Sequence, residues 1–309
     1  MAILTVTLNA ALDITYRVPV LTPRASHRVS DVVERPGGKG INVARVLAAL
    51  GYDTVVTGFA GGPAGTVLRQ LLAPLAPYDA LVPVARTSRR TVAVVDGSGG
   101  DTTQFNEPGP LVSPEEWARF TGVYEALLKD ADAVALCGSL PPGIHVGAYA
   151  ELVRRAHAHD VPVVLDTDGE PLRRGIAARP DLVKPNADEL AGLTGAREPL
   201  RAVLGARRRG ARAVAASFGA DGLLAATADG VWRAAPSAPV RGNPTGAGDS
   251  AVAALLAGLV DGVPWPERLV RAVALSAATV LAPAAGEFDA AAYERLLTDV
   301  TVVRHTEPN

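Results

Sequence analysis

The chain has 309 residues, of which 48% are hydrophobic and 20% are charged, and its formal net charge is −2. The apolar residues can fill a large core, and the near-neutral charge argues against nucleic acid or an anionic membrane as the main partner. The single cysteine, Cys137, lies in an apolar run and excludes a disulfide within the chain. We interpret Cys137 as a core residue rather than a reactive thiol, in a protein of the reducing cytoplasm.

Residues 2–12 are apolar without a basic leader, so we expect a first strand there rather than a signal peptide. Strand-like apolar runs then alternate with helical patterns. The predicted strands cover residues 3–8, 54–60, 133–137, 162–166, 181–183 and 213–217. The predicted helices cover residues 41–50, 66–72, 114–129, 146–159, 189–194, 200–209, 250–260, 268–281 and 290–298. The alternation predicts one α/β domain, residues 1–309, with a mostly parallel sheet, helices on both faces and ligands at the carboxyl ends of the strands.

Two regions break this alternation because no helix separates their short apolar runs. Residues 14–20 with 28–34, and residues 91–96 with 102–106, are typical of hairpins or edge strands that stand apart from the main sheet. The glycine-rich run at residues 97–100 predicts the turn of the second hairpin.

Residues 243–250 read NPTGAGDS and lead directly into an apolar helical stretch. Small residues let backbone N–H groups converge, and the start of a helix adds partial positive charge, so this turn predicts an anion site. A carboxylate beside a bound anion is useful when a proton has to be removed there, as in phosphoryl transfer to a hydroxyl group. Taken alone, the same residues also suit an ordinary helix start with Asp249 near its cap.

A second glycine-rich turn, RPGGKGINVA at residues 35–44, also leads into an apolar helix. Neither turn has the G-x-x-x-x-G-K-[ST] spacing of a Walker A loop. Together, GGKGINVARVL and NPTGAGDS resemble the two signature segments of the ribokinase-like (PfkB) sugar kinases. Lysine occurs only at positions 39, 129 and 184, so its use in the first turn suggests that a compact ammonium group is needed there.

The resemblance covers nearly the whole chain and includes TLNAALD at 7–13, NEPGP at 106–110, CGSLPPG at 137–143, VKPN at 183–186 and SFGADG at 217–222. This set looks most like the branch that acts on sugar phosphates, which includes 1-phosphofructokinase and tagatose-6-phosphate kinase. Ala10 stands where that family usually has proline, which should loosen the turn slightly. The resemblance implies a ribokinase-like fold with a small β lid, about residues 14–34 and 91–106, that in this family often forms a dimer contact. Whether this chain forms a homodimer through the lid stays open.

For the chemical step, the resemblance implies that Asp249 is the general base that takes the proton of the attacking hydroxyl. It also implies that the backbone N–H groups of Gly246, Ala247 and Gly248 face the charge that develops on the transferred phosphoryl group.

On the acceptor side, Asp13 and Asn42 are expected to hydrogen-bond the sugar hydroxyls, because carboxylate and carboxamide groups suit such a network. Glycines 37, 38 and 40 would let the sugar approach the backbone, and we select Gly38 as a contact. A phosphorylated acceptor also needs cations and donors. The candidates for that role are Lys39, Arg28, Arg89 and Ser139.

On the nucleotide side, the resemblance implies ATP contacts by Lys184, Asn186, Thr245, Ser217, Gly219 and Gly222. It further implies that Asn186 and Glu189 orient Mg²⁺, mostly through water. Asn186 and Glu189 also suit a simple capped helix start, and both interpretations can hold at once. The five histidines show no metal-ligand spacing, so no zinc site is predicted.

The sequence therefore predicts an ATP- and Mg²⁺-dependent kinase of a ketohexose phosphate such as fructose 1-phosphate, fructose 6-phosphate or tagatose 6-phosphate. Two alternatives stay open: a kinase of an unphosphorylated sugar or nucleoside on the same fold, and a regulator that binds the same ligands without catalysis. Neither the acceptor nor the hydroxyl that is phosphorylated is specified by the sequence.

Overall fold

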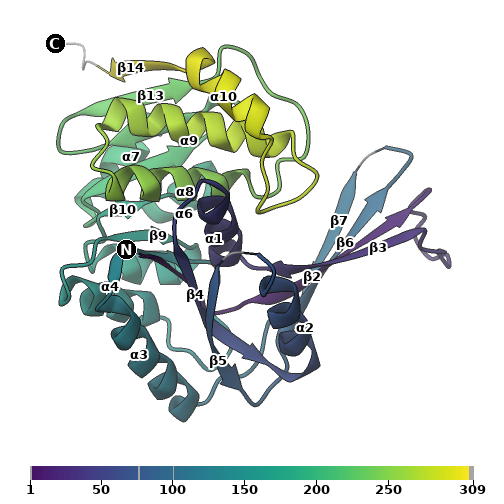
Figure 1. Cartoon of the computed structure of the whole chain (residues 1–309). Helices are drawn as coiled ribbons and strands as arrows, with labels where there is room; N and C mark the ends of the chain where they lie inside the picture. Colours follow the sequence, from purple (N-terminus) through teal and green to yellow (C-terminus); the bar gives the residue numbers. More distant parts are fainter. Residues whose placement is uncertain (1, 76, 100, 306–309) are drawn as a thin grey trace.

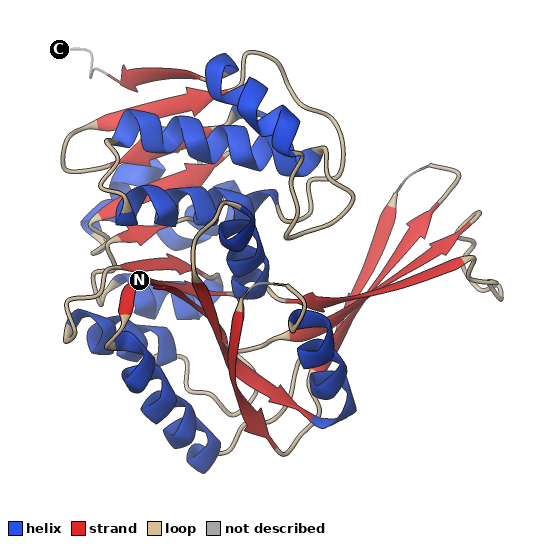
Figure 2. Ribbon diagram, in the orientation of Figure 1, coloured by secondary structure: helices blue, strands red, loops and turns tan. Residues whose placement is uncertain are grey.

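A computed structural model describes residues 2–75, 77–99 and 101–305, and its strands form two separate sheets (Figures 1 and 2). The larger sheet has ten strands in the order β14-β13-β12-β11-β10-β9-β8-β1-β4-β5, and the smaller one has four in the order β3-β2-β6-β7. Gly100, the last residue of the predicted hairpin turn, lies outside the described residues.

Seven neighbouring strands of the large sheet, from β5 to β11, run parallel, which confirms the predicted α/β class with a mostly parallel sheet. These strands are β1 (Ala2–Thr7), β4 (Thr54–Gly61), β5 (Tyr78–Val84), β8 (Ala131–Cys137), β9 (Val163–Asp166), β10 (Leu182–Val183) and β11 (Ala213–Ser217). The helices are α1 (Lys39–Ala49), α2 (Gly62–Leu72), α3 (Pro114–Leu128), α4 (Ala148–His157), α5 (Gly169–Ile176), α6 (Ala187–Thr194), α7 (Pro199–Arg208), α8 (Ala247–Val260), α9 (Trp265–Val280) and α10 (Ala290–Asp299).

Both faces of the parallel sheet are buried, because successive residues of a strand point to opposite sides and both sides are apolar. In β9, Val163 and Leu165 pack into the core formed with α3 to α7, whereas Val164 packs into the core formed with α1, α8 and α9. Figure 1 shows α8 and α9 side by side over one face of the sheet. Within the described part of the chain, no helix has the length and apolar character that a bilayer crossing requires.

The large sheet ends in strands that the sequence pattern did not reveal: β12 (Leu223–Ala226), β13 (Val231–Ala235) and β14 (Thr301–His305) are antiparallel to their neighbours. Only residues 218–222 join β11 to β12, and a connection without a crossover helix reverses the chain direction. The sequence interpretation also missed β5 and α5, which are short and only partly apolar.

The small sheet, called the lid below, comprises β2 (Ala11–Val18), β3 (Asp31–Gly37), β6 (Arg89–Asp96) and β7 (Thr102–Asn106). It includes the four segments expected to form hairpins, although β2 and β6 pair in parallel and lie at the centre of the sheet. The lid projects from the main body beside α2 (Figure 1). One of its faces carries Asp13, Thr91 and Asn106, which are aligned across three strands.

Candidate active site

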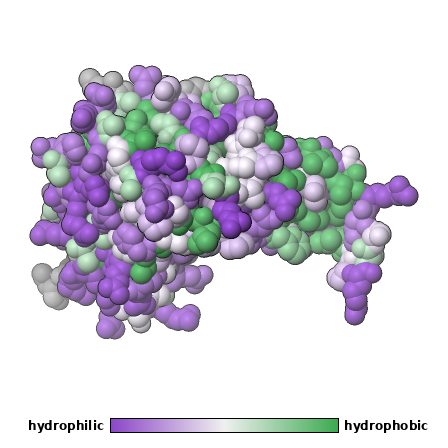
Figure 3. Space-filling view, turned by 90° about the horizontal axis from the view of Figure 1, so that it is seen from below, coloured by the Kyte–Doolittle hydropathy of each residue, from purple (hydrophilic) through white to green (hydrophobic). Residues whose placement is uncertain are grey.

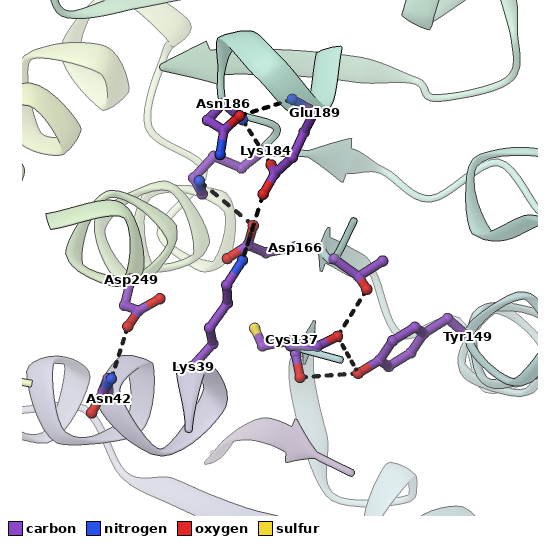
Figure 4. A network of polar contacts seen from close by, with 11 residues as sticks. Lys39, Asn42, Cys137, Tyr149, Asp166, Lys184, Asn186, Glu189 and Asp249 are labelled. Atoms are coloured by element: carbon purple, nitrogen blue, oxygen red, sulfur yellow. Dashed lines mark hydrogen bonds and ion pairs between the residues drawn. The ribbon is translucent and has the colours of Figure 1, made fainter. Parts of the chain in front are cut away.

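The start of α8 places a carboxylate deep in the molecule. Gly246, the residue before the helix, has a φ of 86°, a left-handed conformation that glycine adopts without strain. Asp249, the third residue of α8, is only 7% exposed. The side-chain amide of Asn42, on α1, donates a 2.8 Å hydrogen bond to Asp249 Oδ2. The two glycine-rich turns of the sequence therefore meet at this carboxylate (Figure 4).

The charge of Asp249 is strongly affected by its surroundings. Burial raises the pKa of this carboxyl group, and the nearby Asp166 raises it further. The hydrogen bond from Asn42 and the charges of Lys39 and Lys184 act in the opposite direction, and the balance is a pKa of about 7. A carboxyl group with a pKa near neutrality is suited to accepting a proton from a substrate and releasing it again.

Lys39, the first residue of α1, extends toward the carboxyl end of β9. Its ammonium group lies 3.5 Å from Asp166 Oδ1 and 3.9 Å from Glu189 Oε1. Burial opposes the charge, but the carboxylates of Asp166, Glu189 and Asp249 raise the pKa of Lys39 above its ordinary value. Position 40 has no room for a side chain, because a Cβ atom there would lie 2.4 Å from Thr7 Oγ1. Glycine is therefore needed directly after Lys39.

Asp166 connects the two sides of the site, and the sequence interpretation did not select it. Its Oδ1 atom lies 3.5 Å from both Lys39 Nζ and Lys184 Nζ, while Asp166 is 1% and Lys184 4% exposed (Figure 4). Oδ2 of Asp166 is buried and has no hydrogen-bond partner among the described residues. A signal was present, because Asp166 is the last residue of a predicted strand, at the sheet edge where ligands bind.

One cavity of about 500 Å³ extends from Asp249 to the lid. Most of the expected acceptor residues line it: Asp13, Gly38, Lys39, Asn42 and Arg89. Three lid residues that were not expected also line it, namely Thr91, Gln104 and Asn106. Burial raises the pKa of Asp13 to about 6, although Arg89, Thr91 and Arg45 act to lower it. The cavity can thus present carboxylate, amide and guanidinium groups to a polyhydroxylated anion.

Two of the residues expected to bind the acceptor, Arg28 and Ser139, line neither this cavity nor the second cavity of the site. Arg28 is exposed in the connection between β2 and β3, at the far end of the lid. The lid strands are extended, so this connection lies away from α8 (Figure 1), and Arg28 does not line the cavity that contains Asp249. Ser139 follows β8 and accepts a hydrogen bond from Asn9, whose backbone oxygen in turn binds Arg89.

A second cavity, of about 630 Å³, lies on the other side of the start of α8. Asn186, Ser217, Gly219 and Gly222 line it, as do apolar residues of α9 such as Ala277 and Val280. Lys184 and Thr245, the other two expected ATP contacts, line the first cavity instead. Both cavities include Asn186, Ser217 and Gly248, so they meet beside Asp249.

The turn before α8 offers backbone donors at this junction, although not all three that were expected. The N–H of Ala247 already donates to the carbonyl oxygen of Pro244 at 3.1 Å. Among the described residues, Gly246 and Gly248 donate no backbone hydrogen bond, and both line the cavity that contains Asp249. Both N–H groups, with the helix dipole behind them, are therefore free to contact an anion.

Asn186 and Glu189 form a capping box at the start of α6. Asn186 Oδ1 accepts from the Glu189 N–H, and Glu189 Oε2 accepts from the Asn186 N–H, both at 2.8 Å. Residues 2–75, 77–99 and 101–305 contain no cluster of three acidic, histidine or cysteine side chains that could hold a metal ion. Oε1 of Glu189, which lies 3.9 Å from the Lys39 ammonium group, and Oδ2 of Asp166, which has no hydrogen-bond partner among the described residues, are oxygen donors, which Mg²⁺ prefers. These residues fit an ion bound mainly by water and phosphate, not by a protein cage.

Cys137, at the end of β8, is fully buried beside this network (Figure 4). Burial raises the pKa of its thiol well above the ordinary value, as do Asp166 and Asp249. Its carbonyl oxygen accepts a 3.0 Å hydrogen bond from the Tyr149 hydroxyl. The thiol is therefore a buried core group whose surroundings oppose ionisation.

Comparison with known proteins extends these observations. Residues 6–291 match the pfkB family of carbohydrate kinases. The 1-phosphofructokinase of Rhodobacter capsulatus is 37% identical over 290 residues, which cover 91% of this chain and 92% of that protein. A possible 1-phosphofructokinase of Thermotoga maritima has a similar structure, with a TM-score of 0.89, 27% identity and coverage of 99% of this chain and 100% of that one. Phosphofructokinase-2 of Escherichia coli in complex with fructose-6-phosphate gives a TM-score of 0.87 and 28% identity, over 96% of this chain and 98% of that one. The chain belongs to the pfkB family of carbohydrate kinases.

Proposed function

We propose that this chain transfers the γ-phosphoryl group of ATP to a hydroxyl group of a ketohexose phosphate. The observation that carries the proposal is the position of Asp249, a buried carboxyl group with a pKa of about 7 at the junction of two cavities. Apolar residues of α9 and the glycine-rich 219–222 turn line one cavity, as suits a nucleotide. Lys39, Arg89 and Asp13 line the other, as suits a sugar phosphate.

In the chemical step, an acceptor hydroxyl group in the cavity below the lid loses its proton to a carboxylate oxygen of Asp249. The hydroxyl oxygen forms a bond to the γ-phosphorus, the bond from phosphorus to the bridging oxygen breaks, and ADP leaves with that electron pair. The N–H groups of Gly246 and Gly248 face the negative charge on the transferred group. Asn42 holds the Asp249 carboxylate in place through its 2.8 Å hydrogen bond.

The two lysines of the site act on opposite substrates. Both lysines line the acceptor-side cavity. We assign Lys184, two residues before Asn186, to the ATP phosphates and Lys39 to the acceptor. We also assign Mg²⁺, held through water by Asn186 and Glu189, as the ion that neutralises charge on the ATP phosphates. ATP as substrate and the single buried thiol together favour the cytoplasm as the place of action.

The acceptor is assigned as a phosphate ester because of Arg89. Burial lowers the pKa of this guanidinium group from its very high ordinary value, and the group, which is charged in proteins, lines the cavity from the base of the lid. Among ketohexose phosphates, fructose 1-phosphate is the first candidate, because the relative at 37% identity is a 1-phosphofructokinase. Fructose 6-phosphate and tagatose 6-phosphate are the next candidates.

The test is a panel that measures ADP formation with fructose 1-phosphate, fructose 6-phosphate, tagatose 6-phosphate, fructose, ribose and adenosine, with and without Mg²⁺. We expect the highest kcat/KM with one of the three phosphorylated sugars. Preference for fructose, ribose or adenosine would overturn the assignment in favour of a kinase of unphosphorylated acceptors. Binding of ATP and sugar phosphate without turnover of any acceptor would indicate a non-catalytic regulator.

We further propose that two copies of the chain associate through the lid. The lid face opposite the cavity carries the aligned residues Ile14, Tyr16, Val32, Val92, Val94 and Phe105. Val32 is 55% and Phe105 60% exposed, and Figure 3 shows apolar residues gathered on this projecting part. An exposed apolar sheet face of this kind favours a protein partner, and the phosphofructokinase-2 of Escherichia coli is tetrameric in its inhibited form.

Sedimentation of V32E tests the association, with V303E as control, because Val303 on β14 is similarly exposed at 58% but lies outside the lid. We expect a dimer for the wild type and for V303E, and a monomer for V32E. A monomeric wild type, or equal dissociation of both variants, would contradict association through the lid.

A further inference from the structure

The connection between α9 and α10, residues 281–289, contacts two groups of the active site. Ala285 lines the acceptor-side cavity, and it lies so close to the turn before α8 that a Cβ atom at Gly246 would be 2.7 Å from Ala285 Cα. Gly286 is buried against α1, where its own Cβ atom would be 3.2 Å from Asn42 Oδ1. The connection therefore touches both the turn that offers N–H groups to an anion and the residue that holds the general base.

Arg45, on α1, holds this connection in place. Its Nη1 atom donates a 3.0 Å hydrogen bond to the carbonyl oxygen of Ala285, and its Nη2 atom donates a 3.0 Å hydrogen bond to Glu287 Oε1. The side chain of Arg45 is only 9% exposed. No backbone hydrogen bond joins residues 283–288 to another part of the chain that the structure describes. The guanidinium group is therefore the main polar attachment of the connection.

Arg45 and Glu287 act from outside the two cavities, because neither side chain lines one of them. Arg45 lies about one turn after Asn42, so the same face of α1 carries the residue that hydrogen-bonds the general base and the residue that holds the connection. Glu287 Oε1 also lies 3.7 Å from Arg35 Nε on β3, which extends the attachment to the lid. A planar guanidinium group that donates at two points sets the distance between its partners, which a single ammonium group cannot do.

We propose that Arg45, together with Glu287, is a positioning residue for the phosphoryl-transfer step: it fixes the connection against Gly246, so that the N–H groups of the turn before α8 stay directed at the transferred phosphoryl group. The inference rests on the proposed function, which assigns those N–H groups to the charge of the transition state. Fixed donors lower the barrier only while they are aligned with that charge, and small displacements reduce the rate strongly. Arg45 therefore acts on kcat and has little effect on the binding of ATP.

The test compares R45M with G286A. R45M removes both hydrogen bonds, but it also removes a charge that lowers the pKa of Asp13, whereas G286A keeps every charge. The added methyl group of G286A would lie 2.7 Å from Arg45 Nη1, and residue 286 has a φ of 75°, so alanine there displaces the connection. We expect each variant to lower kcat by about 10- to 100-fold, with the KM for ATP within about threefold of the wild-type value. In G286A the KM for the acceptor should also stay within about threefold of that value.

The matched control is R69M. Arg69, on α2, also donates to one carboxylate and one backbone carbonyl oxygen, those of Asp79 and Leu81, and it lines neither cavity. We expect R69M to lower the midpoint of thermal unfolding, as R45M does, while its kcat stays at the wild-type value.

E287A separates the two hydrogen bonds of Arg45. It keeps the bond to the Ala285 carbonyl oxygen, so it should lower kcat less than R45M does. In the R45M background, E287A should change kcat by less than about threefold, because the attachment is already lost. If R45M does not fold, the kcat values of E287A and G286A carry the test.

A wild-type kcat in R45M or G286A, an equal loss of kcat in R69M, or multiplicative effects of R45M and E287A would each overturn the role of Arg45. The proposed function fails differently, since in that case the wild type itself does not prefer any phosphorylated sugar. The kcat values are compared with whichever acceptor the wild type prefers, so a different acceptor leaves the comparison intact.

Discussion

Replacing Asp166 with asparagine removes the carboxylate that Lys39 and Lys184 share. Each ammonium group lies 3.5 Å from Asp166 Oδ1, a separation at which two unit charges attract by about 5 kcal/mol with an effective dielectric constant near 20. The substitution does not cost the two lysines the same amount of ion-pair energy. The side chain of Lys39 is 36% exposed and keeps Glu189 nearby, so its share is at most about 1 kcal/mol.

Lys184 accounts for most of the expected loss in the free energy of unfolding. Lys184 is 4% exposed, and D166N removes the carboxylate with which it forms an ion pair in the described structure. Removing one partner of a buried ion pair costs about 3–5 kcal/mol, so D166N should lower the free energy of unfolding by about that amount. Urea unfolding monitored by circular dichroism measures it. The double variant D166N/K184M replaces the pair with uncharged groups of similar size and should recover most of the stability without recovering activity.

D166N should also shift the pH profile of any activity that remains. The charge of Asp166 helps to raise the pKa of Asp249 to about 7, so its removal lowers that pKa. A general base must be ionised, so kcat/KM decreases as the pH falls below its pKa. The acidic limb of kcat/KM should therefore lie near pH 7 in the wild type and at lower pH in D166N. Unchanged stability, no recovery in the double variant, or a limb that moves to higher pH would refute this account of Asp166.

Three further predictions follow from the site. R89A should reduce kcat/KM for the sugar phosphate by about 10- to 100-fold but hardly affect an unphosphorylated sugar, whereas equal losses would indicate a folding defect. In hydrogen exchange the lid should be less protected than β1, β8 and β9, and sugar phosphate should protect it more than ATP does; equal, ligand-independent protection would contradict closure of the lid on the acceptor. D249N should be more stable than the wild type above pH 7 by up to about 4 kcal/mol, because the raised pKa of Asp249 means that its ionisation opposes folding there. That gain should disappear below about pH 4, where the carboxyl group is protonated in the folded and unfolded chains alike, and urea unfolding at both pH values measures it.

Much of the fold could be predicted because most of its elements carry strong local signals. The helix at Pro114–Leu128 begins with a serine, a proline and two glutamates, and the strand at Ala213–Ser217 is an uninterrupted small apolar run. The strands β12, β13 and β14 escaped prediction because their pairing partners are distant or follow short turns, and their own residues are mostly alanine, arginine and valine. Pairing of this kind is decided by tertiary contacts and not by local periodicity.

In the site, too, some residues are predictable from local sequence signals and others only from tertiary contacts. Asp249, Asn42 and Lys39 lie in the first turns of helices that follow glycine-rich segments visible in the sequence, and the structure brings them together. Asp166 contacts Lys39 and Lys184, which are distant from it in the chain, and only the fold reveals those contacts. Arg28 was expected in the acceptor site because it is charged and belongs to a lid segment, but neither property specifies where the end of a hairpin points.

The central claim, that Asp249 removes the proton from the acceptor, is tested most directly by the turnover of D249N with the preferred sugar phosphate. Asparagine keeps the shape of the side chain and lacks the basic oxygen. The account predicts that kcat falls by at least about 100-fold, while the KM values for ATP and for the sugar phosphate change little. Turnover near the wild-type rate in the folded variant would contradict it and remove Asp249 from the role of base.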